Sequence, residues 1–342
     1  MKALLLAAPR DFRVVDVPEP DRPGPGEALV RVHRVGVCGT DISGYLGKMP
    51  FFTYPRIPGH ELGVEVVAVG DGVTHVRVGD RCSVEPYIND PGSYASRRGF
   101  PNCCERLEVL GVHRDGGLRE RFALPARKLH PAGSLTFEQL ALVETLAIGR
   151  HAVARSGLQV GETCLIVGAG PIGLAVLEFV RLLGVDPVVL DLHEGRLRFV
   201  REALGVTRTI PAGPAVDVEA AVRDATGGHL ADVVIDATGS SRSMAAAFGY
   251  VASGGGRLVY VGITTDEIAF RHVTFHRPEG TLLCSRNALP GDFTAIIGLI
   301  EGGQINTDRW VTHHSAFADL PAAFPSYVQP ETGVIKAVVS LD

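Results

Sequence analysis

The chain has 342 residues, of which 46% are hydrophobic and 21% charged, and its formal net charge is −5 at pH 7. This length and apolar content suffice for two globular domains with buried cores. The arginines alternate with acids and form no basic run, which argues against a nucleic-acid partner. We expect an ordinary soluble protein.

No segment of the sequence predicts export or a membrane span. Residues 1–7 resemble a first strand, and Pro9, Arg10 and Asp11 interrupt any apolar signal-like stretch. The longest nearly uncharged run, 163–177, is too short to cross a bilayer. Six cysteines without a paired framework indicate a reducing compartment, so we expect a cytoplasmic protein with no membrane partner.

The first half of the chain is predicted to be mostly β-structure. Strand-like runs at 28–37, 62–69 and 81–84 are separated by Gly, Pro and Asp at turn-like intervals. Residues 136–155 then form an apolar-periodic helix that carries Glu144 on an otherwise apolar face.

Two short motifs within the β-rich half supply a thiolate, an imidazole and a carboxylate. Cys38 lies in Cys-Gly-Thr-Asp, and His60 and Glu61 follow Gly59. A catalytic zinc takes three protein ligands of N, S and O type and leaves one position open. We therefore interpret Cys38, His60 and Glu61 as ligands of a zinc that acts as a Lewis acid. Taken singly, a buried cysteine is more often a small core residue than a metal ligand, and the other two residues are also typical of a polar turn.

Strand and helix patterns alternate from residue 164 to about residue 261, which indicates a parallel sheet. The segment from residue 289 onward mixes a helix, 293–301, with closing strands such as 335–341, and we expect it to fold back onto the first domain. The strands expected in the parallel sheet are 163–167, 188–191, 208–210, 232–236 and 257–262.

A glycine-rich turn joins the first of these strands to a helical pattern at 174–183. In the run Gly-Ala-Gly-Pro-Ile-Gly, Gly168 permits a tight turn, Gly170 lets the backbone approach a pyrophosphate, and Gly173 allows the helix to pack on the strand. The helix N-terminus would face the phosphates. The turn, which includes Pro171 and Ile172, therefore predicts a dinucleotide site.

Asp191 ends the second strand of the parallel sheet, about twenty residues after the glycines. Its carboxylate can accept hydrogen bonds from the adenosine ribose and repel a 2′-phosphate, which favours NAD over NADP. Arg196 and Arg198 are the counter-evidence, because arginine suits a 2′-phosphate. We interpret Arg196 as lying over the adenine ring or on a solvated helix face.

Together these motifs resemble the zinc-dependent medium-chain dehydrogenases, and among them the sorbitol, threonine and sugar-acid dehydrogenases. The resemblance runs from end to end. It is carried by residues 37–41, 58–61, 78–81, 116–117, 168–173 and 285–288.

The resemblance implies an α/β protein with two domains. A GroES-like, β-rich catalytic domain would comprise residues 1–149 and 287–342, and a Rossmann NAD-binding domain with a doubly wound parallel sheet would comprise residues 150–286. The chemistry would take place in the cleft between them. The relatives are commonly homodimers or homotetramers, which we expect here.

The resemblance also assigns roles to further residues. Glu144 corresponds to a carboxylate that binds the metal directly or through its water. Thr40 corresponds to a hydroxyl that relays the alcohol proton, and Ser43 replaces a histidine found in many relatives. One of three arginines could pair with a substrate carboxylate, although all three are equally typical of surface charge: Arg119, Arg121 and Arg286.

One lobe of the sequence departs from the family. Where relatives hold a structural zinc with four cysteines, this chain has Asp90, Ser93, Ser96 and Cys104. Aspartate and serine are weak zinc ligands compared with thiolate. We therefore expect one catalytic zinc and no structural zinc. The sequence predicts a lobe held by residues such as Tyr94 and Phe100 or by a partner subunit, with Cys103 and Cys104 as ordinary thiols.

The combined prediction is a zinc-dependent enzyme that transfers a hydride between NAD and a secondary alcohol of a polyol or sugar acid. Two alternatives remain open. One is a zinc-free, NADPH-dependent reductase of the same fold, and the other is a non-catalytic nucleotide-binding protein.

Overall fold

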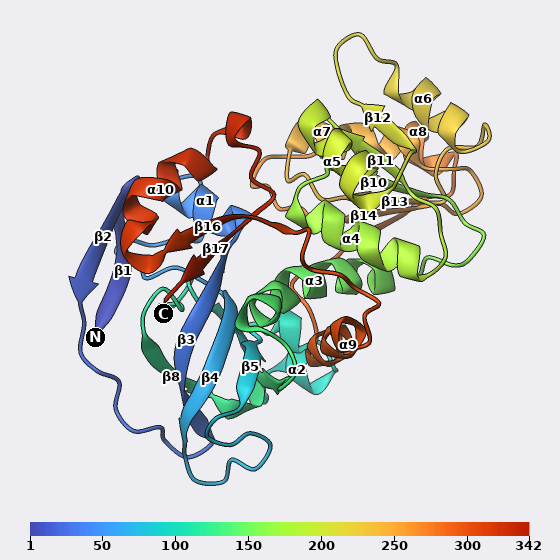
Figure 1. Cartoon of the computed structure of the whole chain (residues 1–342). Helices are drawn as coiled ribbons and strands as arrows, with labels where there is room; N and C mark the ends of the chain where they lie inside the picture. Colours follow the sequence, from blue (N-terminus) through green and yellow to red (C-terminus); the bar gives the residue numbers. More distant parts are fainter. Residues whose placement is uncertain (342) are drawn as a thin grey trace. The chain divides into compact units, whose positions relative to one another are not determined.

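The computed structural model describes residues 1–341, which divide into two compact units (Figure 1). One unit contains Met1–Glu144 and the segment from Ala288 onward, and the other contains Thr145–Asn287. The division falls after Glu144, inside helix α3 (Phe137–Ser156), whereas the sequence places it after residue 149 of the same helix.

The first unit is built on a seven-stranded sheet in the order β16-β17-β3-β4-β5-β9, with β8 also paired to β3. The long strand β3 pairs with β4 along one edge, and with β8 and then β17 along the other. In Figure 1 the red C-terminal strands β16 and β17 lie beside the blue β3, so strands from early and late in the chain share one sheet. This arrangement confirms that the C-terminal segment folds back onto the first domain. The strands of this unit are β1 (Lys2–Ala8), β2 (Asp11–Asp16), β3 (Glu27–Val37), β4 (Glu61–Val69), β5 (Arg81–Val84), β6 (Tyr87–Ile88), β7 (Glu108–Val109), β8 (Arg121–Pro125), β9 (Leu129–Pro131), β16 (Val311–Ala316) and β17 (Lys336–Ser340).

The core of the first unit lies between this sheet and the short elements that cover it. Leu62, Val64 and Val66 of β4 are fully buried, and Leu320 and Phe324 of α10 belong to the same cluster. These three apolar residues alternate along β4 with Glu61, Gly63 and Glu65, so they share the face that packs into the core. Besides α3, the helices are α1 (Gly39–Tyr45), α2 (Tyr94–Arg97), α9 (Pro290–Glu301) and α10 (Leu320–Tyr327).

The second unit is a six-stranded, wholly parallel sheet in the order β12-β11-β10-β13-β14-β15. The strand order reverses at β10, between β11 and β13. In open α/β sheets such a switch point is where ligands bind, outside the carboxyl ends of the strands. The elements are β10 (Cys164–Val167), α4 (Pro171–Leu182), β11 (Val188–Asp191), α5 (Glu194–Leu204), β12 (Thr209–Pro211), α6 (Val218–Ala225), β13 (Val233–Asp236), α7 (Ser241–Ala247), β14 (Arg257–Tyr260), α8 (His272–His276) and β15 (Thr281–Cys284).

The predicted parallel sheet is confirmed, with two differences. The sixth strand, β15, is absent from the prediction because its side chains are mostly exposed, so it lacks the buried apolar pattern of its neighbours. Helix α4 begins at Pro171 rather than Leu174, because proline suits the first helical position, where its missing N–H costs nothing. Within residues 1–341, no helix has the length and apolarity needed to cross a membrane.

Candidate metal centre and dinucleotide turn

Cys38 occupies the position before the first turn of α1, at the end of β3. The backbone N–H of Cys38 donates to Asp41 Oδ2 at 2.9 Å, and the N–H of Ile42 donates to the Cys38 carbonyl. Asp41 thus caps the helix and fixes the thiol's position at the same time.

His60 and Glu61 enter the site at the start of β4. Gly59 has φ of +97°, and a Cβ there would lie 2.9 Å from Val35, so the turn requires glycine. The Gly59 carbonyl accepts from the Gly117 N–H at 2.8 Å, and that of Pro58 accepts from Leu118 at 3.0 Å. This backbone pairing places the Gly116-Gly117 motif of the sequence directly beside the motif of residues 58–61.

The structure brings Cys38, His60 and Glu61 together, with one ligand atom from each residue within 4.8 Å of the other two. Residues 1–341 contain no other such group of three among His, Cys, Asp and Glu. His60 and Glu61 are buried and Cys38 is half-buried. Mixed sulfur, nitrogen and oxygen donors at this spacing suit zinc.

Asp41 lies behind one ring nitrogen of His60. His60 Nδ1 and Asp41 Oδ1 lie 3.8 Å apart, both are buried, and neither has a hydrogen-bond partner within residues 1–341. A carboxylate behind one ring nitrogen leaves Nε2 as the metal-binding atom. Burial alone would lower the pKa of His60, but Cys38 and Asp41 raise it well above its ordinary value. A proton therefore competes with a metal for this imidazole.

Glu61 makes a contact that the sequence does not predict. Lys336 Nζ, on β17, donates to both carboxylate oxygens of Glu61 at 2.7 Å, and to the Val37 carbonyl at 3.3 Å. Both side chains are about 1% exposed. Burial alone would lower the pKa of Lys336, but Glu61 and Cys38 raise it, so the ammonium stays charged.

Glu144 lies outside the group of three ligand atoms, buried on α3. The buried Tyr87 donates its hydroxyl to Glu144 Oε1. Burial raises the pKa of Glu144, and His60 opposes that shift. Burial and the negative charge of Glu144 raise the pKa of Tyr87 well above its ordinary value, so the phenol keeps the proton that it donates. Sequence analysis missed Tyr87 because nothing in its local pattern marks it.

The glycine turn has the backbone that was predicted. Gly168 has φ of +97°, and a Cβ at Gly173 would lie 1.7 Å from the Gly168 carbonyl oxygen. By contrast, a Cβ at Gly170 would meet only Arg196 Nη1, at 3.8 Å. The space beside Gly170, at the N-terminus of α4, can therefore receive another group, as pyrophosphate binding requires.

Asp191 stands at the carboxyl end of β11, beside this turn. Its Oδ2 accepts from the Ala169 N–H at 2.6 Å, and its Oδ1 accepts from the His193 N–H at 2.7 Å. Arg196 Nη1 lies 3.7 Å from Oδ2. Each carboxylate oxygen has further lone pairs, so Asp191 can still bind a ribose hydroxyl.

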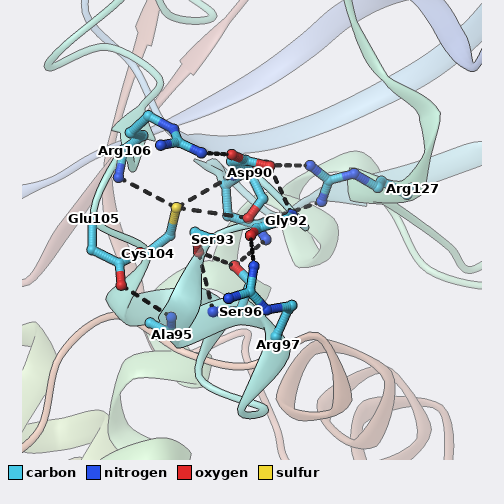
Figure 2. A network of polar contacts seen from close by, with 11 residues as sticks. Asp90, Gly92, Ser93, Ala95, Ser96, Arg97, Cys104, Glu105, Arg106 and Arg127 are labelled. Atoms are coloured by element: carbon cyan, nitrogen blue, oxygen red, sulfur yellow. Dashed lines mark hydrogen bonds and ion pairs between the residues drawn. The ribbon is translucent and has the colours of Figure 1, made fainter.

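The cysteine-poor lobe is organised around the sulfur of Cys104 (Figure 2). The backbone N–H groups of Asp90 and Arg106 donate to Sγ at 3.3 and 3.4 Å, and Sγ lies 3.8 Å from the Asp90 carbonyl. The Arg106 guanidinium pairs with the Asp90 carboxylate. Ser93 and Ser96 bond each other at 2.9 Å. Cys104 and the three residues that replace the family's other cysteines thus form a polar network.

The side chains of Tyr94 and Phe100 are more than half exposed, and the Tyr94 hydroxyl accepts a hydrogen bond from Arg98 at 3.1 Å. That these residues or a partner subunit hold the lobe stays a prediction. Serine and aspartate cap the lobe's short helix and turn. The expectation that Cys104 is an ordinary thiol was wrong, since it is buried and accepts hydrogen bonds, whereas Cys103 is exposed.

The remaining residues that the sequence suggests for substrate binding or proton transfer lie in the first unit, apart from Arg286. Arg119 lies over the Phe122 ring at 4.9 Å, and Arg121 reaches Glu19 at 3.5 Å, so both have structural partners. Thr40 is half-buried on α1, two residues from Cys38. Ser43 lies on the same short helix.

Family models match both units of the chain. The alcohol dehydrogenase GroES-like domain matches residues 24–134, and the zinc-binding dehydrogenase model matches residues 171–302. The L-galactonate-5-dehydrogenase of Escherichia coli K12 is 38% identical over 318 residues, which cover 93% of each chain. The L-arabinitol 4-dehydrogenase of Aspergillus oryzae is 32% identical over 332 residues, 92% of this chain and 86% of the relative.

Solved structures agree over the full length. An alcohol dehydrogenase of Escherichia coli CFT073, solved in complex with the cofactor NADH, has a TM-score of 0.90 and 27% identity, and the match covers 100% of this chain and 99% of that one. These matches confirm the predicted fold class and enzyme class. The chain therefore belongs to the zinc-type, medium-chain alcohol dehydrogenase family.

Proposed function

We propose that the protein is an NAD-dependent dehydrogenase that oxidises a secondary alcohol of a polyol or sugar acid, with one zinc ion held by Cys38, His60 and Glu61. The observation that carries this proposal is the convergence of three unlike ligand atoms within 4.8 Å. The activities named for the sugar-acid and polyol relatives support the substrate class.

The residues of the first unit would share the chemistry as follows. Zinc, when bound, supplies the Lewis acidity that lowers the pKa of an alcohol. Asp41 holds the imidazole of His60 in one orientation. Glu144, which Tyr87 holds in place, binds the metal directly or through a water. The hydroxyl of Thr40 would carry the alcohol proton away from the site, and Ser43, on the same short helix, stands where many relatives have a histidine.

The residues of the second unit would hold the dinucleotide. Asp191 accepts hydrogen bonds from the adenosine ribose, and Arg196 lies over the adenine. NAD supplies the hydride acceptor. The glycine turn binds the pyrophosphate, and the space beside Gly170 supports this assignment. The residues of the turn assigned to the cofactor are Gly168, Gly170, Pro171, Ile172 and Gly173.

Metal analysis combined with a substrate panel tests the proposal. Purified protein should contain zinc and reduce NAD in the presence of some member of a panel of polyols and sugar acids, followed by NADH absorbance. Zinc-free protein that reduces enones or quinones with NADPH would favour the reductase alternative. Zinc-free protein that binds NAD without turnover would favour the non-catalytic alternative.

We further propose that the protein forms a homodimer or homotetramer in the cytoplasm. The edge strand β15 supports this, because it leaves Leu282 43% exposed beside an unpaired strand edge. Light scattering after size exclusion should give a dimer or tetramer, and Leu282→Lys should dissociate it. Val160→Lys, which places a lysine at an exposed residue of the same unit outside β15, is the matched control. A monomeric wild type would contradict the proposal.

A further inference from the structure

A pocket of about 350 Å³ lies at the C-terminal end of α1, and none of its lining residues is a candidate metal ligand. Tyr45, the last residue of the helix, lines it together with Leu46, and the end of α10 supplies Val328 and Gln329. Cys38, by contrast, precedes the first turn of α1. The pocket is therefore a second site of the first unit, and its volume is in the range of small-molecule sites.

Backbone and aromatic contacts give this pocket its shape. The N–H of Arg10, in the turn between β1 and β2, donates to the Tyr45 carbonyl, and the N–H of Lys48 donates to the Ser43 carbonyl, both at 2.8 Å. The Tyr45 ring packs against Phe324 of α10, with ring centroids 4.8 Å apart, and Figure 1 shows α10 beside α1. The backbones of two cationic residues are thus fixed at the pocket by the fold itself.

The two cations at the pocket have no counter-charge. Three of the four lysines of the chain, Lys2, Lys128 and Lys336, pair with a carboxylate. Within residues 1–341, the side chains of Lys48 and Arg10 have no hydrogen-bond or ion-pair partner, and no acidic residue lines the pocket. Cations beside a low-dielectric wall attract an anion more strongly than isolated surface charges do.

Two further features of the pocket point to a ligand. Tyr45 is 6% exposed, yet its hydroxyl has no hydrogen-bond partner within the part of the chain that the structure describes. A buried hydroxyl usually has a partner, so this one is available to a bound group. Arg10 has φ of +65°, a left-handed conformation that glycine adopts at lower cost. Backbone strain of this kind clusters at functional sites.

We propose that this pocket binds a small organic oxyanion, that is, a carboxylate or phosphate group carried on an apolar body. Arg10 and Lys48 hold the oxyanion by charge-assisted hydrogen bonds, and the Tyr45 hydroxyl donates one more. The apolar body lies against Leu46 and Val328. The proposal does not depend on the zinc-dependent function proposed above, because it uses no metal ligand and no residue of the dinucleotide turn.

Calorimetry of the full-length protein with phenyl phosphate, benzoate and phenol tests the proposal. NAD is present throughout, so that the probes do not occupy the dinucleotide site. We expect phenyl phosphate or benzoate to bind at one site per chain, and phenol, which has the same ring without the oxyanion, to bind at least about 10-fold more weakly.

Variants then locate the bound oxyanion. Arg10→Gln and Lys48→Gln should each weaken binding about 10-fold, as expected for the loss of one charged donor. Tyr45→Phe keeps the ring against Phe324 and should weaken binding less. The matched control is Arg22→Gln, at an exposed arginine of the same unit outside the pocket, which should match the wild type. Arg10 and Lys48 are exposed, so their variants should fold, and thermal unfolding checks this.

The three probes also distinguish the sources of the oxyanion. Tighter binding of phenyl phosphate identifies the ligand class as phosphate monoesters, and tighter binding of benzoate identifies it as carboxylates, so either result supports the proposal. Three results would overturn it: phenol that binds as tightly as the charged probes, binding that R10Q and K48Q leave unchanged, or no binding of any probe at millimolar concentration.

Discussion

Gly36 and Glu61 are direct partners across strands β3 and β4, and the missing side chain of Gly36 is the space that the Glu61 carboxylate occupies. A Cβ built on Gly36 would lie 2.1 Å from Glu61 Oε2 and 2.9 Å from Glu61 Cβ. The second contact involves an atom next to the backbone, so rotating the carboxylate cannot relieve it. The position of a metal ligand thus depends on a glycine in the neighbouring strand.

Gly36→Ala should therefore displace Glu61 from both Lys336 and the ligand group. We expect a loss of stability of about 1–3 kcal/mol, as for overpacking of a buried site, and weaker zinc binding. Urea unfolding and chelator competition measure the two effects. The control is Gly298→Ala in α9, where an added Cβ meets nothing within 4 Å. Unchanged zinc affinity in G36A would contradict the assignment of Glu61 as a ligand.

Cys38→Ser should abolish turnover and leave NAD binding intact. The thiol belongs to the first unit, whereas the glycine turn and Asp191 belong to the second. Serine is a poor replacement for thiolate at a zinc, but the helix cap from Asp41 Oδ2 to the backbone of residue 38 remains available. Cofactor binding is measured by calorimetry or fluorescence titration. A parallel loss of NAD affinity and activity would argue against this division of labour.

The fold and the ligand group follow from local sequence patterns. Apolar residues alternate over much of β3 and the first half of β4, the parallel strands are short apolar runs, and the glycine turn joins a strand to a helix, so each signal lies within a short window. Cys38, His60 and Glu61 are recognisable because their types and neighbours are specific to one kind of chemistry. Such features depend little on distant residues.

The partners of those ligands could not be predicted in the same way. Lys336 meets Glu61 through strand pairing across 275 positions, and Tyr87 meets Glu144 across 57. From the sequence, Gly36 is an ordinary strand glycine, and its role becomes visible only when the register of β3 against β4 pairs it with Glu61. In the lobe, the loss of three cysteines was visible, but the hydrogen bonds that replace them depend on backbone N–H directions that a sequence does not display.

Asp191→Ala should raise the Michaelis constant for NAD and relax the bias against NADP. The change removes a ribose acceptor and a negative charge, and it frees Arg196, now 3.7 Å from the carboxylate, to meet a 2′-phosphate. A fall in kcat/KM for NAD of about 10- to 100-fold matches the loss of one hydrogen bond to a charged group.

The double variant Asp191→Ala/Arg196→Ala is the control for the improved use of NADP that Asp191→Ala should show. It should bind NADP less well than the single variant, because the arginine that meets the phosphate is gone. Asp191 also accepts the Ala169 N–H, so thermal unfolding must accompany the kinetics. A wild type that prefers NADP would overturn the assignment.

The protein should hold about one zinc per chain, at Cys38, His60 and Glu61. In the lobe, Cys104 is the one cysteine retained at the four positions of the family's structural-zinc site, and its sulfur already accepts two backbone N–H bonds. Zinc content measured by plasma emission should fall to near zero in Cys38→Ser and stay unchanged in Cys104→Ser. A second equivalent of zinc that disappears in Cys104→Ser would show that the lobe binds metal after all.

The contribution of Cys104 to stability should increase with pH. Burial alone would raise the pKa of its thiol, but hydrogen bonds from Ser93, Ser96 and the backbone lower it below the ordinary value of 9.0. Between the lowered pKa and 9.0 the unfolded chain binds more protons than the folded one, so stability rises with pH in this range. The contribution is fully present above 9.0 and is lost as the pH falls through the folded pKa.

Cys104→Ser removes this titration while keeping a side chain of similar size. The difference in unfolding free energy between wild type and Cys104→Ser should therefore grow as the pH is raised from neutral toward 9.0. Urea unfolding at several pH values measures it. Cys103→Ser, at the exposed neighbouring thiol, should show no such growth. A difference that stays flat for Cys104→Ser would mean that the network binds the neutral thiol as well as the thiolate, and that the lobe is held by the pairing of Asp90 with Arg106 instead.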